Sequence, residues 1–243
     1  MARQRLDQLL VTRGLFESRA RARAAIEAGG VRVEGAVVKR ASTPVDEAAA
    51  IEAQAAHRWV GRGALKLEAA LNLWPVPVEG LTALDVGAST GGFTEVLLER
   101  GARRVYAVDV GRGQLHPRLA ADPRVVSLEG RDARSLDTTL VPEPVALVVC
   151  DASFIGLAKV LPAALALAGP EADLVVLVKP QFEVGPERVG KGGVVRNEAV
   201  RREAVAGVRK WLVAQRWRVR GEAESPVTGG DGNVEYLLWA SRI

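Results

Sequence analysis

The fold of this chain is decided by residues 81–110, LTALDVGASTGGFTEVLLERGARRVYAVDV. The apolar run over residues 81–86 is too short for a helix and stops at a glycine, which is typical of a buried parallel strand. After a glycine-rich turn, helical spacing resumes over residues 93–100, and residues 104–110 predict a second strand that carries Asp109. This order of strand, glycine turn, helix and strand predicts an α/β fold with a parallel sheet.

The turn after the first strand indicates which ligand this fold binds. A dinucleotide site would place G-x-G-x-x-G opposite a pyrophosphate, whereas residues 87–92 read GASTGG and follow Asp85, which would repel phosphate. An acid there suits a cationic ligand such as S-adenosylmethionine, and Asp109 is placed to accept hydrogen bonds from two ribose hydroxyls. We therefore favour S-adenosylmethionine over NAD, with a ligand-free tight turn as the simpler alternative. The expected cofactor-binding residues are Asp85, Gly87, Ala88, Ser89, Thr90, Gly91, Gly92, Phe93, Asp109 and, through the adenine amino group, Asp132.

Composition limits the classes of protein to which the chain can belong. With 243 residues and 48% hydrophobic content, it can form one large domain or a small and a medium one. No run of about 18 apolar residues could span a bilayer, and the first residues lack a signal-peptide core, so a cytoplasmic protein is expected. Cys150 is the only cysteine, which excludes an internal disulfide, and with two histidines besides it no metal site is expected.

The first 40 residues carry more positive charge than the chain as a whole. They hold nine basic and four acidic residues, a net charge of +5 against +4 for all 243 residues. Helical spacing over residues 5–13, a second helix that Ser18 caps and that runs to about residue 28, and short strands over residues 31–33 and 37–39 predict an α+β module. Clustered arginines are typical of a surface that contacts nucleic-acid phosphates, and the alternative is a solvated arginine face.

The pattern RLDQLLVTRGLFESRARARAAIEAGGVRVEGAVVKR resembles a small RNA-binding module that a ribosomal small-subunit protein shares with many pseudouridine synthases. The resemblance covers roughly residues 3–53. In that family the basic face of the second helix, together with the first helix, lies against folded RNA. The resemblance therefore implies RNA contacts from Arg3, Arg5, Arg19 and Arg23.

Charged side chains follow predicted strands at the edge of the sheet where the glycine turn lies. Residues 145–150, VALVVC, predict a buried strand followed by Asp151, and residues 173–178 predict another that is followed by Lys179. Ligands bind at the carboxyl ends of strands in open α/β sheets, so both side chains are expected beside the turn. Lys66 lies among the leucines of a predicted helix, residues 63–73, where a snorkelling surface lysine is the simpler interpretation. Other predicted elements are strands over residues 125–128 and 218–224, a helix over residues 199–215, and a final strand over residues 234–240 that bears Glu235.

Two lysines and two acids beside a methyl donor predict methylation of a poor nucleophile such as a ribose 2′-hydroxyl. The hydroxyl must lose its proton, and a lysine can accept it where a neighbouring positive charge and partial burial favour the neutral amine. Asp151 and Glu235 would orient the ammonium groups and balance their charge. Because the sulfonium of the donor already makes the methyl electrophilic, the protein supplies placement and electrostatics, and no metal is required.

The motifs LDVGASTGGFT, AVDVG, CDASF, LVKPQFE, GKGGVVRN and GNVEYLLW, preceded by RGALKL, closely resemble the TlyA family of ribosomal RNA ribose methyltransferases, which is related to the FtsJ methyltransferases. The resemblance spans the whole chain. It implies a small RNA-binding domain over residues 1–56, a linker over residues 57–63, and a Rossmann-like class I methyltransferase domain with a seven-stranded mixed sheet over residues 64–243.

The resemblance also implies the activity and its residues. The family's Lys-Asp-Lys-Glu tetrad falls on Lys66, Asp151, Lys179 and Glu235, with Lys179 as the expected base. The implied reaction is the S-adenosylmethionine-dependent 2′-O-methylation of a cytidine in ribosomal RNA. Some longer members also modify the small subunit, so the compact ends of this chain favour the large subunit. The expected partner is ribosomal RNA or a ribosomal subunit, without a membrane, and a monomer is favoured while the oligomeric state stays open.

Two glycine-rich loops are expected to close over the cofactor or the RNA. Residues 185–197, GPERVGKGGVVRN, are basic and lack periodicity, and their Lys191 and Arg196 could contact phosphate, unless the loop is merely solvated. Residues 225–233 precede Glu235, and their GGDGN at residues 229–233 predicts a close approach to the target nucleotide.

Two other classes of function stay open from the sequence. Some members of the family carry the name haemolysin, but neither a spanning segment nor a cationic amphipathic helix that exposes aromatic residues is visible. The chain could also keep the methyltransferase fold only to hold RNA, in which case the tetrad would be dispensable.

Overall fold

The computed structural model describes residues 3–229 and 232–243. The chain divides into two compact units, Met1–Arg58 and Trp59–Ile243. Trp59 is 3% exposed and packs in a core of the second unit. The second unit therefore begins inside the segment that was expected to be a linker. Among the described residues, no helix is long and apolar enough to cross a membrane.

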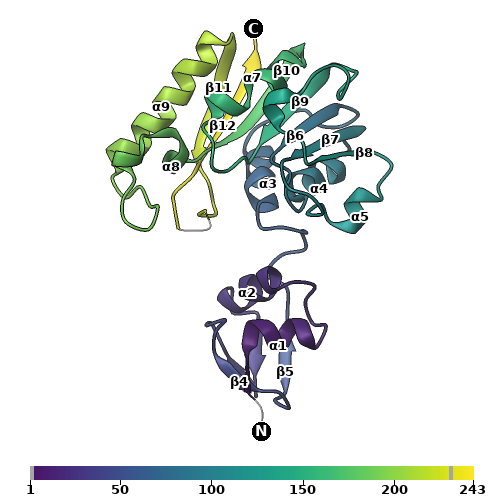
Figure 1. Cartoon of the computed structure of the whole chain (residues 1–243), viewed down its shortest axis with the longest axis vertical. Coiled ribbons are helices and arrows are strands. Elements are labelled where there is room, and N and C mark those ends of the chain that lie inside the picture. The colour runs from purple at the N-terminus through teal and green to yellow at the C-terminus, as the bar shows by residue number, and fades with distance from the viewer. Residues whose placement is uncertain (1–2, 230–231) are drawn as a thin grey trace. The chain divides into compact units, whose positions relative to one another are not determined.

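The first unit combines two helices with two small sheets (Figure 1). One sheet pairs β1 (Arg3–Arg5) with β4 (Pro44–Asp46), and the other has β2 (Val31–Val33) between β3 (Ala36–Val37) and β5 (Ile51–Ala53), with every pairing antiparallel. The helices are α1 (Leu6–Thr12) and α2 (Arg19–Glu27). Their apolar side chains, with Leu6, Leu10 and Ile26 fully buried, form the core of this unit.

Local sequence signals set the helix ends in the first unit. Gly14 takes a left-handed conformation with φ of +68° after α1, where few other residues are stable. The side chain of Ser18 accepts a hydrogen bond from the backbone of Arg21, which confirms the predicted cap of α2. The two helices and the strand at residues 31–33 were predicted from the sequence, whereas β1, β4 and β5 were not.

The second unit is built on one seven-stranded sheet of order β11-β12-β10-β9-β6-β7-β8. β12 runs antiparallel to both of its neighbours, β10 and β11, and the remaining pairs of neighbouring strands are parallel. The strands are β6 (Thr82–Val86), β7 (Arg104–Asp109), β8 (Val125–Glu129), β9 (Val145–Cys150), β10 (Ala168–Val178), β11 (Trp217–Glu224) and β12 (Tyr236–Arg242). This mixed sheet confirms the predicted α/β fold class.

Helices cover both faces of the sheet and create two cores (Figure 1). On one face lie α3 (Ala64–Leu73), α4 (Gly92–Glu99) and α5 (Pro117–Ala120), and on the other lie α6 (Leu157–Val160), α7 (Pro162–Ala166) and α9 (Glu198–Ala214). Shorter elements are α8 (Pro180–Glu183), η1 (Ala133–Ser135) and η2 (Pro186–Arg188). Side chains alternate along a strand, so Val148 and Cys150 enter one core while Leu147 and Val149 enter the other. This burial on both faces explains the unbroken apolar run of β9.

The carboxyl ends of the central strands are joined by hydrogen bonds just beyond the sheet. The backbone of Gly87, after β6, donates to the carbonyl oxygen of Val108 in β7 at 2.9 Å. The backbone of Asp151, after β9, donates to the carbonyl oxygen of Val86 in β6 at 3.1 Å. These bonds hold the glycine turn and the segment after β9 side by side.

Candidate active site

The structure brings the four predicted tetrad residues together at this edge. Lys66 of α3 donates a hydrogen bond to Oε2 of Glu235 at 2.6 Å. The Nζ of Lys66 also lies 3.7 Å from Oδ1 of Asp151, and the same oxygen lies 2.7 Å from Nζ of Lys179. Cations and anions therefore alternate along a row that runs from Glu235 through Lys66 and Asp151 to Lys179.

The tetrad is largely shielded from water. Lys66 is 7% exposed, Lys179 6% and Glu235 2%. Burial of a charge is costly unless an opposite charge and hydrogen bonds compensate, and here two ammonium groups face two carboxylates. Lys66 is thus a buried ion-pair partner and not the snorkelling surface lysine that its helix alone favoured.

Lys179 also contacts Ser153, a residue that was not predicted from the sequence to belong to the site. Its Nζ donates to the backbone oxygen of Asp151 at 2.9 Å and to Oγ of Ser153 at 2.8 Å, besides the ion pair with the Asp151 carboxylate. The side chain of Ser153 is exposed, although it contacts this buried lysine. The only sequence signal for Ser153 is its place two residues after Asp151.

Two cavities meet at the glycine turn. The first, of about 480 Å³, extends toward the ends of β7 and β8 and is lined by apolar residues that include Val108, Val110 and Ile155. The second, of about 340 Å³, contains Lys66, Lys179 and Glu235. The residues that line both are Gly87, Ser89, Asp151, Ser153 and Phe154. A ligand in one cavity therefore reaches the other beside Asp151.

Gly87 makes the junction of the two cavities possible. Its φ is +83°, and a Cβ atom placed on it would lie 2.9 Å from the backbone nitrogen and Cα of Ala152. Any side chain would push the turn away from the segment after β9. The glycine is thus required both for its conformation and for the close approach of two backbones.

Asp109 lies at the carboxyl end of β7 and lines the first cavity. One carboxylate oxygen accepts a hydrogen bond from the backbone of Ser89 at 2.8 Å, and the other accepts one from the backbone of Gly111 at 2.7 Å. Each oxygen keeps a second lone pair, so the carboxylate can still accept from a ligand. Asp109 holds the glycine turn and also presents an acceptor pair to the cavity.

Asp85 lies beneath the turn and lines neither cavity. It is completely buried, and its Oδ2 accepts a hydrogen bond of 2.7 Å from Thr94, while within the described residues Oδ1 has no hydrogen-bond partner. Burial raises the pKa of Asp85 to about 7, against the hydrogen bond from Thr94, and the negative charge of Asp151 adds to the rise. The structure therefore does not place Asp85 where its charge would contact a cationic ligand.

The other predicted cofactor residues divide between the two cavities. Gly87, Ser89, Asp109 and Asp132 line the first, while Gly87, Ala88, Ser89, Thr90, Gly92 and Phe93 line the second. Gly91 lines neither, because it is buried against Leu115 and Leu119. Both carboxylate oxygens of Asp132 already accept from Arg134, whose hydrogen bonds lower the pKa of Asp132 to about 2.

The two predicted closing loops are tied to each other. The side chain of Asn233, 1% exposed, accepts a hydrogen bond from the backbone of Val195 at 3.0 Å and donates one to the carbonyl of Gly193 at 2.9 Å. Lys191 and Arg196 are exposed and line neither cavity. In the second loop Gly229 lines the second cavity and lies against Glu235, whereas Gly230 and Asp231 lie outside the described residues.

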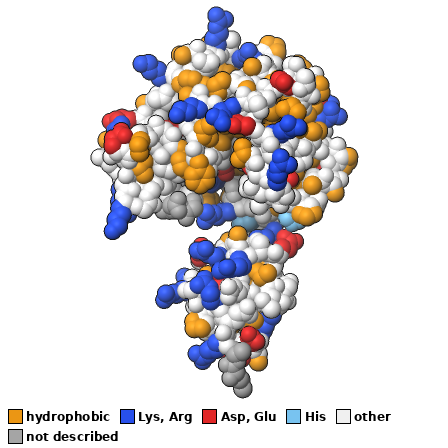
Figure 2. Space-filling model, viewed as in Figure 1, with side chains coloured by type: hydrophobic (Ala, Val, Ile, Leu, Met, Phe, Trp, Pro, Cys, Tyr) orange, Lys and Arg blue, Asp and Glu red, His pale blue; other side chains and the backbone are white. Residues whose placement is uncertain are grey.

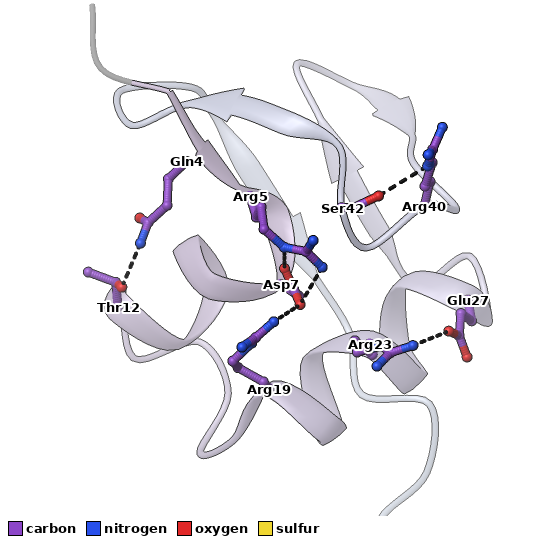
Figure 3. A network of polar contacts seen from close by, with 9 residues as sticks. All are labelled: Gln4, Arg5, Asp7, Thr12, Arg19, Arg23, Glu27, Arg40 and Ser42. Carbon is purple, nitrogen blue, oxygen red and sulfur yellow. Dashed lines mark hydrogen bonds and ion pairs between the residues drawn. The ribbon is translucent and has the colours of Figure 1, made fainter. Parts of the chain in front are cut away.

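The predicted RNA-binding arginines of the first unit are all exposed, and two share a buried acid. Arg5 and Arg19 form ion pairs with Asp7 at 3.0 and 2.8 Å (Figure 3), and Asp7 is completely buried. The hydrogen bonds from Arg5, and secondarily those from Arg19, lower the pKa of Asp7 to about 2. Arg23 lies 4.0 Å from Glu27 on the next turn of α2. Figure 2 shows Lys and Arg side chains gathered on the side of this unit that carries α2.

Aromatic and amide groups at the second cavity were not singled out from the sequence. Phe154 is 90% exposed and has a φ of +67°, and its ring centroid lies 5.3 Å from that of Phe182. Gln181 also lines this cavity, and its buried Oε1 has no hydrogen-bond partner among the described residues. The motif letters contain these residues, but no spacing rule assigns them a role.

Comparison with known families decides where the chain belongs. Residues 59–242 match the family model of the FtsJ-like methyltransferases, and residues 4–51 match that of the S4 domain. The chain is an FtsJ-like methyltransferase. The matched part of the FtsJ-like domain contains the whole tetrad and both cavities.

Curated relatives and solved structures extend this FtsJ-like assignment over both units. The chain is 48% identical to the 16S/23S rRNA (cytidine-2′-O)-methyltransferase TlyA of Mycobacterium tuberculosis, over 98% of this chain and 89% of that one. It is 36% identical to Hemolysin A of Brachyspira hyodysenteriae, over 96% and 98% of the two chains. A Streptococcus thermophilus structure, provisionally described as a hemolysin, is 36% identical with a TM-score of 0.79, over 100% of this chain and 89% of that one. The match to TlyA confirms the predicted family.

Proposed function

We propose that this FtsJ-like methyltransferase transfers a methyl group from S-adenosylmethionine to the ribose 2′-hydroxyl of a cytidine in ribosomal RNA. The observation that carries the proposal is the buried row Glu235–Lys66–Asp151–Lys179 at the junction of two cavities. A junction of this kind suits a reaction that joins two ligands. The cytidine and the ribosomal RNA come from the name of the mycobacterial relative.

The first cavity fits the methyl donor. Asp109 offers two carboxylate oxygens to the ribose hydroxyls, and the apolar side chains of Val110, Ile155 and Val160 suit the flat adenine. Asp132 is less available for the adenine amino group than the sequence suggested, because Arg134 engages it. When bound, the donor supplies an electrophilic methyl group on a sulfonium. A donor in the first cavity could present that group at the turn of Gly87, which lines both cavities together with Asp151.

The second cavity would receive the target ribose. Lys179 is the group that takes the proton of the 2′-hydroxyl, since it lines this cavity and contacts Asp151 and Ser153, which line both cavities. Asp151 contacts both lysines and fixes the distance between them. Glu235 holds Lys66 in place and balances its charge, so that the site remains close to neutral.

The first unit would bind the ribosomal RNA. It matches the S4 domain, and Arg3, Arg5, Arg19 and Arg23 are its proposed phosphate contacts. Because Asp7 pairs with both Arg5 and Arg19, it orients these two guanidinium groups and leaves one net positive charge for RNA. Lys191 and Arg196 are proposed as additional phosphate contacts in the FtsJ-like domain. The reaction would take place on ribosomes or their precursors in the cytoplasm, with large-subunit RNA as the first substrate to test.

A methylation assay tests the proposal directly. The purified chain is incubated with isotopically labelled S-adenosylmethionine and with large subunits, small subunits or naked ribosomal RNA that lack the modification, and methylated riboses are then mapped. We expect label on a cytidine ribose, and none with Lys179→Ala. Transfer to small subunits alone would reject the large-subunit assignment. A chain that binds the donor but methylates none of these substrates would reject the function.

A further inference from the structure

Three oxygens of the protein surround the Nζ of Lys179. The backbone oxygen of Asp151 and Oγ of Ser153 accept hydrogen bonds from it at 2.9 and 2.8 Å, and Oδ1 of Asp151 forms an ion pair with it at 2.7 Å. The lysine is 6% exposed. A substrate hydroxyl that bonded directly to this nitrogen would compete with these three oxygens.

The three neighbours differ in what they can do for a proton. The backbone oxygen of Asp151 is fixed by the chain and cannot carry a proton onward. The carboxylate of Asp151 is shared with Lys66, so moving it would disturb the ion-pair row. Ser153 has a hydroxyl that both accepts and donates, it is exposed, and it lines both cavities. Asp151 and Ser153 both face the two cavities, but only the hydroxyl of Ser153 can accept a proton and donate its own without disturbing the ion-pair row.

We propose that Ser153 is a catalytic residue that relays the proton of the target ribose hydroxyl to Lys179. The inference deepens the proposed function and rests on it, because it names the atom between substrate and base. It also explains how a lysine that is largely buried can act on a substrate that lies in an open cavity.

The proposed step conserves atoms and charge. The step starts after the Lys179 ammonium has released one proton to solvent. The resulting amine then accepts a hydrogen bond from Oγ–H of Ser153, and the Ser153 oxygen accepts one from the ribose 2′-hydroxyl. As the ribose oxygen bonds to the methyl carbon and the carbon–sulfur bond breaks, the ribose proton moves to Ser153 and the serine proton moves to Lys179. The positive charge of the sulfonium thus ends on the Lys179 ammonium, and a neutral thioether leaves.

Two substitutions of Ser153 that have the same shape as each other test the role of its hydroxyl group. Ser153→Thr keeps the hydroxyl and Ser153→Val replaces it with a methyl group in the same volume, which also excludes a water molecule that could substitute for it. The exposed position leaves room for both. We expect the single-turnover methylation rate to remain within about 3-fold of the original with Ser153→Thr, and to fall about 100-fold with Ser153→Val. Equal rates for the two variants would overturn the relay.

The number of protons transferred during the methylation step can be measured, and a purely structural role of Ser153 would not affect it. Single-turnover rates are measured in mixtures of H₂O and D₂O. For the unmodified protein we expect a curved dependence on the deuterium fraction, because two protons move together. For Ser153→Val we expect a linear dependence with one proton. A linear dependence in the unmodified protein would overturn the relay even if Ser153→Val were slow.

The same experiments separate this inference from the proposed function. Donor and RNA affinities are measured for each variant, and Ser153→Val should change both by less than about 3-fold. If Lys179→Ala remains active, the assignment of Lys179 as the base fails, and the relay fails with it. If Lys179→Ala is inactive while Ser153→Val is as fast as Ser153→Thr, only the relay is wrong and Lys179 contacts the ribose directly.

Discussion

Asp109 separates donor binding from methyl transfer. Asp109→Ala removes the carboxylate proposed to accept from two ribose hydroxyls, and a hydrogen bond to a charged group contributes about 1.5–3 kcal/mol. We therefore expect donor affinity to fall at least about 10-fold, as measured by calorimetry with S-adenosylmethionine. Lys179→Ala is the control, since it should stop transfer and leave donor affinity unchanged. Equal losses of affinity in both variants would contradict the division of roles.

The substitution also changes the glycine turn, which needs its own control. Asp109 accepts from the backbone of Ser89 and Gly111, so Asp109→Ala frees two donors that its carboxylate now holds. Asp109→Asn keeps one oxygen for these contacts and should lose less affinity. If both variants lose the same affinity, the negative charge matters more than the geometry of the turn.

We expect the free energy of unfolding to depend on pH through Asp85. Its pKa is raised to about 7 in the folded protein, against an ordinary value of 3.8 for this side chain. Between about pH 4 and pH 7 the unfolded chain ionises this group while the folded chain keeps it protonated, so stability falls as pH rises through that window and levels off above it. Asp85→Asn cannot ionise and should remove this loss, which amounts to about 2–4 kcal/mol. Denaturant melts at pH 4.5 and pH 8 measure the difference, and parallel pH curves for the two proteins would contradict it.

At the residue scale, the sequence indicated the charged residues of the site more readily than their neutral hydrogen-bond partners. Asp151 and Lys179 could be proposed because they directly follow buried strands at one edge of the sheet. Lys66 and Glu235 could be proposed because the family motif contains them. Ser153 could not, because a serine in a loop has no pattern that distinguishes a hydrogen-bond partner of a base from a solvated side chain. Asp85 was given a ligand contact because its position in the chain does not reveal that Thr94 covers it from α4.

At the scale of elements, two glycines that flank β6 allow a matched pair of substitutions, with Gly87 in the glycine turn and Gly80 before the strand. Gly87 and Gly80 both have positive φ, at +83° and +73°, so replacement by alanine costs each about 1 kcal/mol of backbone strain. Only at Gly87 would the new Cβ meet backbone atoms, 2.9 Å away in Ala152, whereas at Gly80 nothing lies within 4 Å. We expect Gly87→Ala to destabilise the protein by about 3 kcal/mol or more and to weaken donor binding at least about 10-fold. Gly80→Ala should leave donor binding unchanged, and similar losses in both variants would refute the close-contact argument.

Element boundaries show where sequence patterns carry information. The buried central strands β6, β7 and β9 were predicted to within a residue, because an apolar run with a glycine or charge at its end is distinctive. Strand β10 starts at Ala168 and not at residue 173. The earlier start was missed because these first residues include Gly169 and Pro170, and the register against β9 shifts between Ala168 and Asp173. Strands β4 and β5 of the first unit, each three residues long, exist only through pairing with distant residues, which no local pattern reveals.

Charge is distributed unevenly over the whole molecule. The unit Met1–Arg58 holds ten basic and seven acidic residues, a net charge of +3, and the remaining 185 residues hold 23 basic and 22 acidic residues, a net charge of +1. Less than a quarter of the chain thus carries most of its excess charge. If the first unit is the proposed RNA-binding surface, the salt dependence of RNA binding should originate mainly there.

Removing four positive charges from one unit or from the other tests whether the first unit is the source of the salt-dependent RNA affinity. Replacing Arg3, Arg5, Arg19 and Arg23 by glutamine should weaken binding to ribosomal RNA and reduce the slope of log affinity against log salt by about 3, because each phosphate contact contributes about 0.7–0.9. The matched control replaces Lys210, Arg216, Arg218 and Arg220, which are equally exposed and cluster around the end of α9 and the start of β11. It changes the net charge by the same amount and should change the slope by less than 1.

A fragment that begins at Trp59, which keeps that buried side chain in its core, should show the low slope as well. If the control and the arginine variant lose slope equally, RNA responds to net charge alone, and the first unit has no privileged role in binding it.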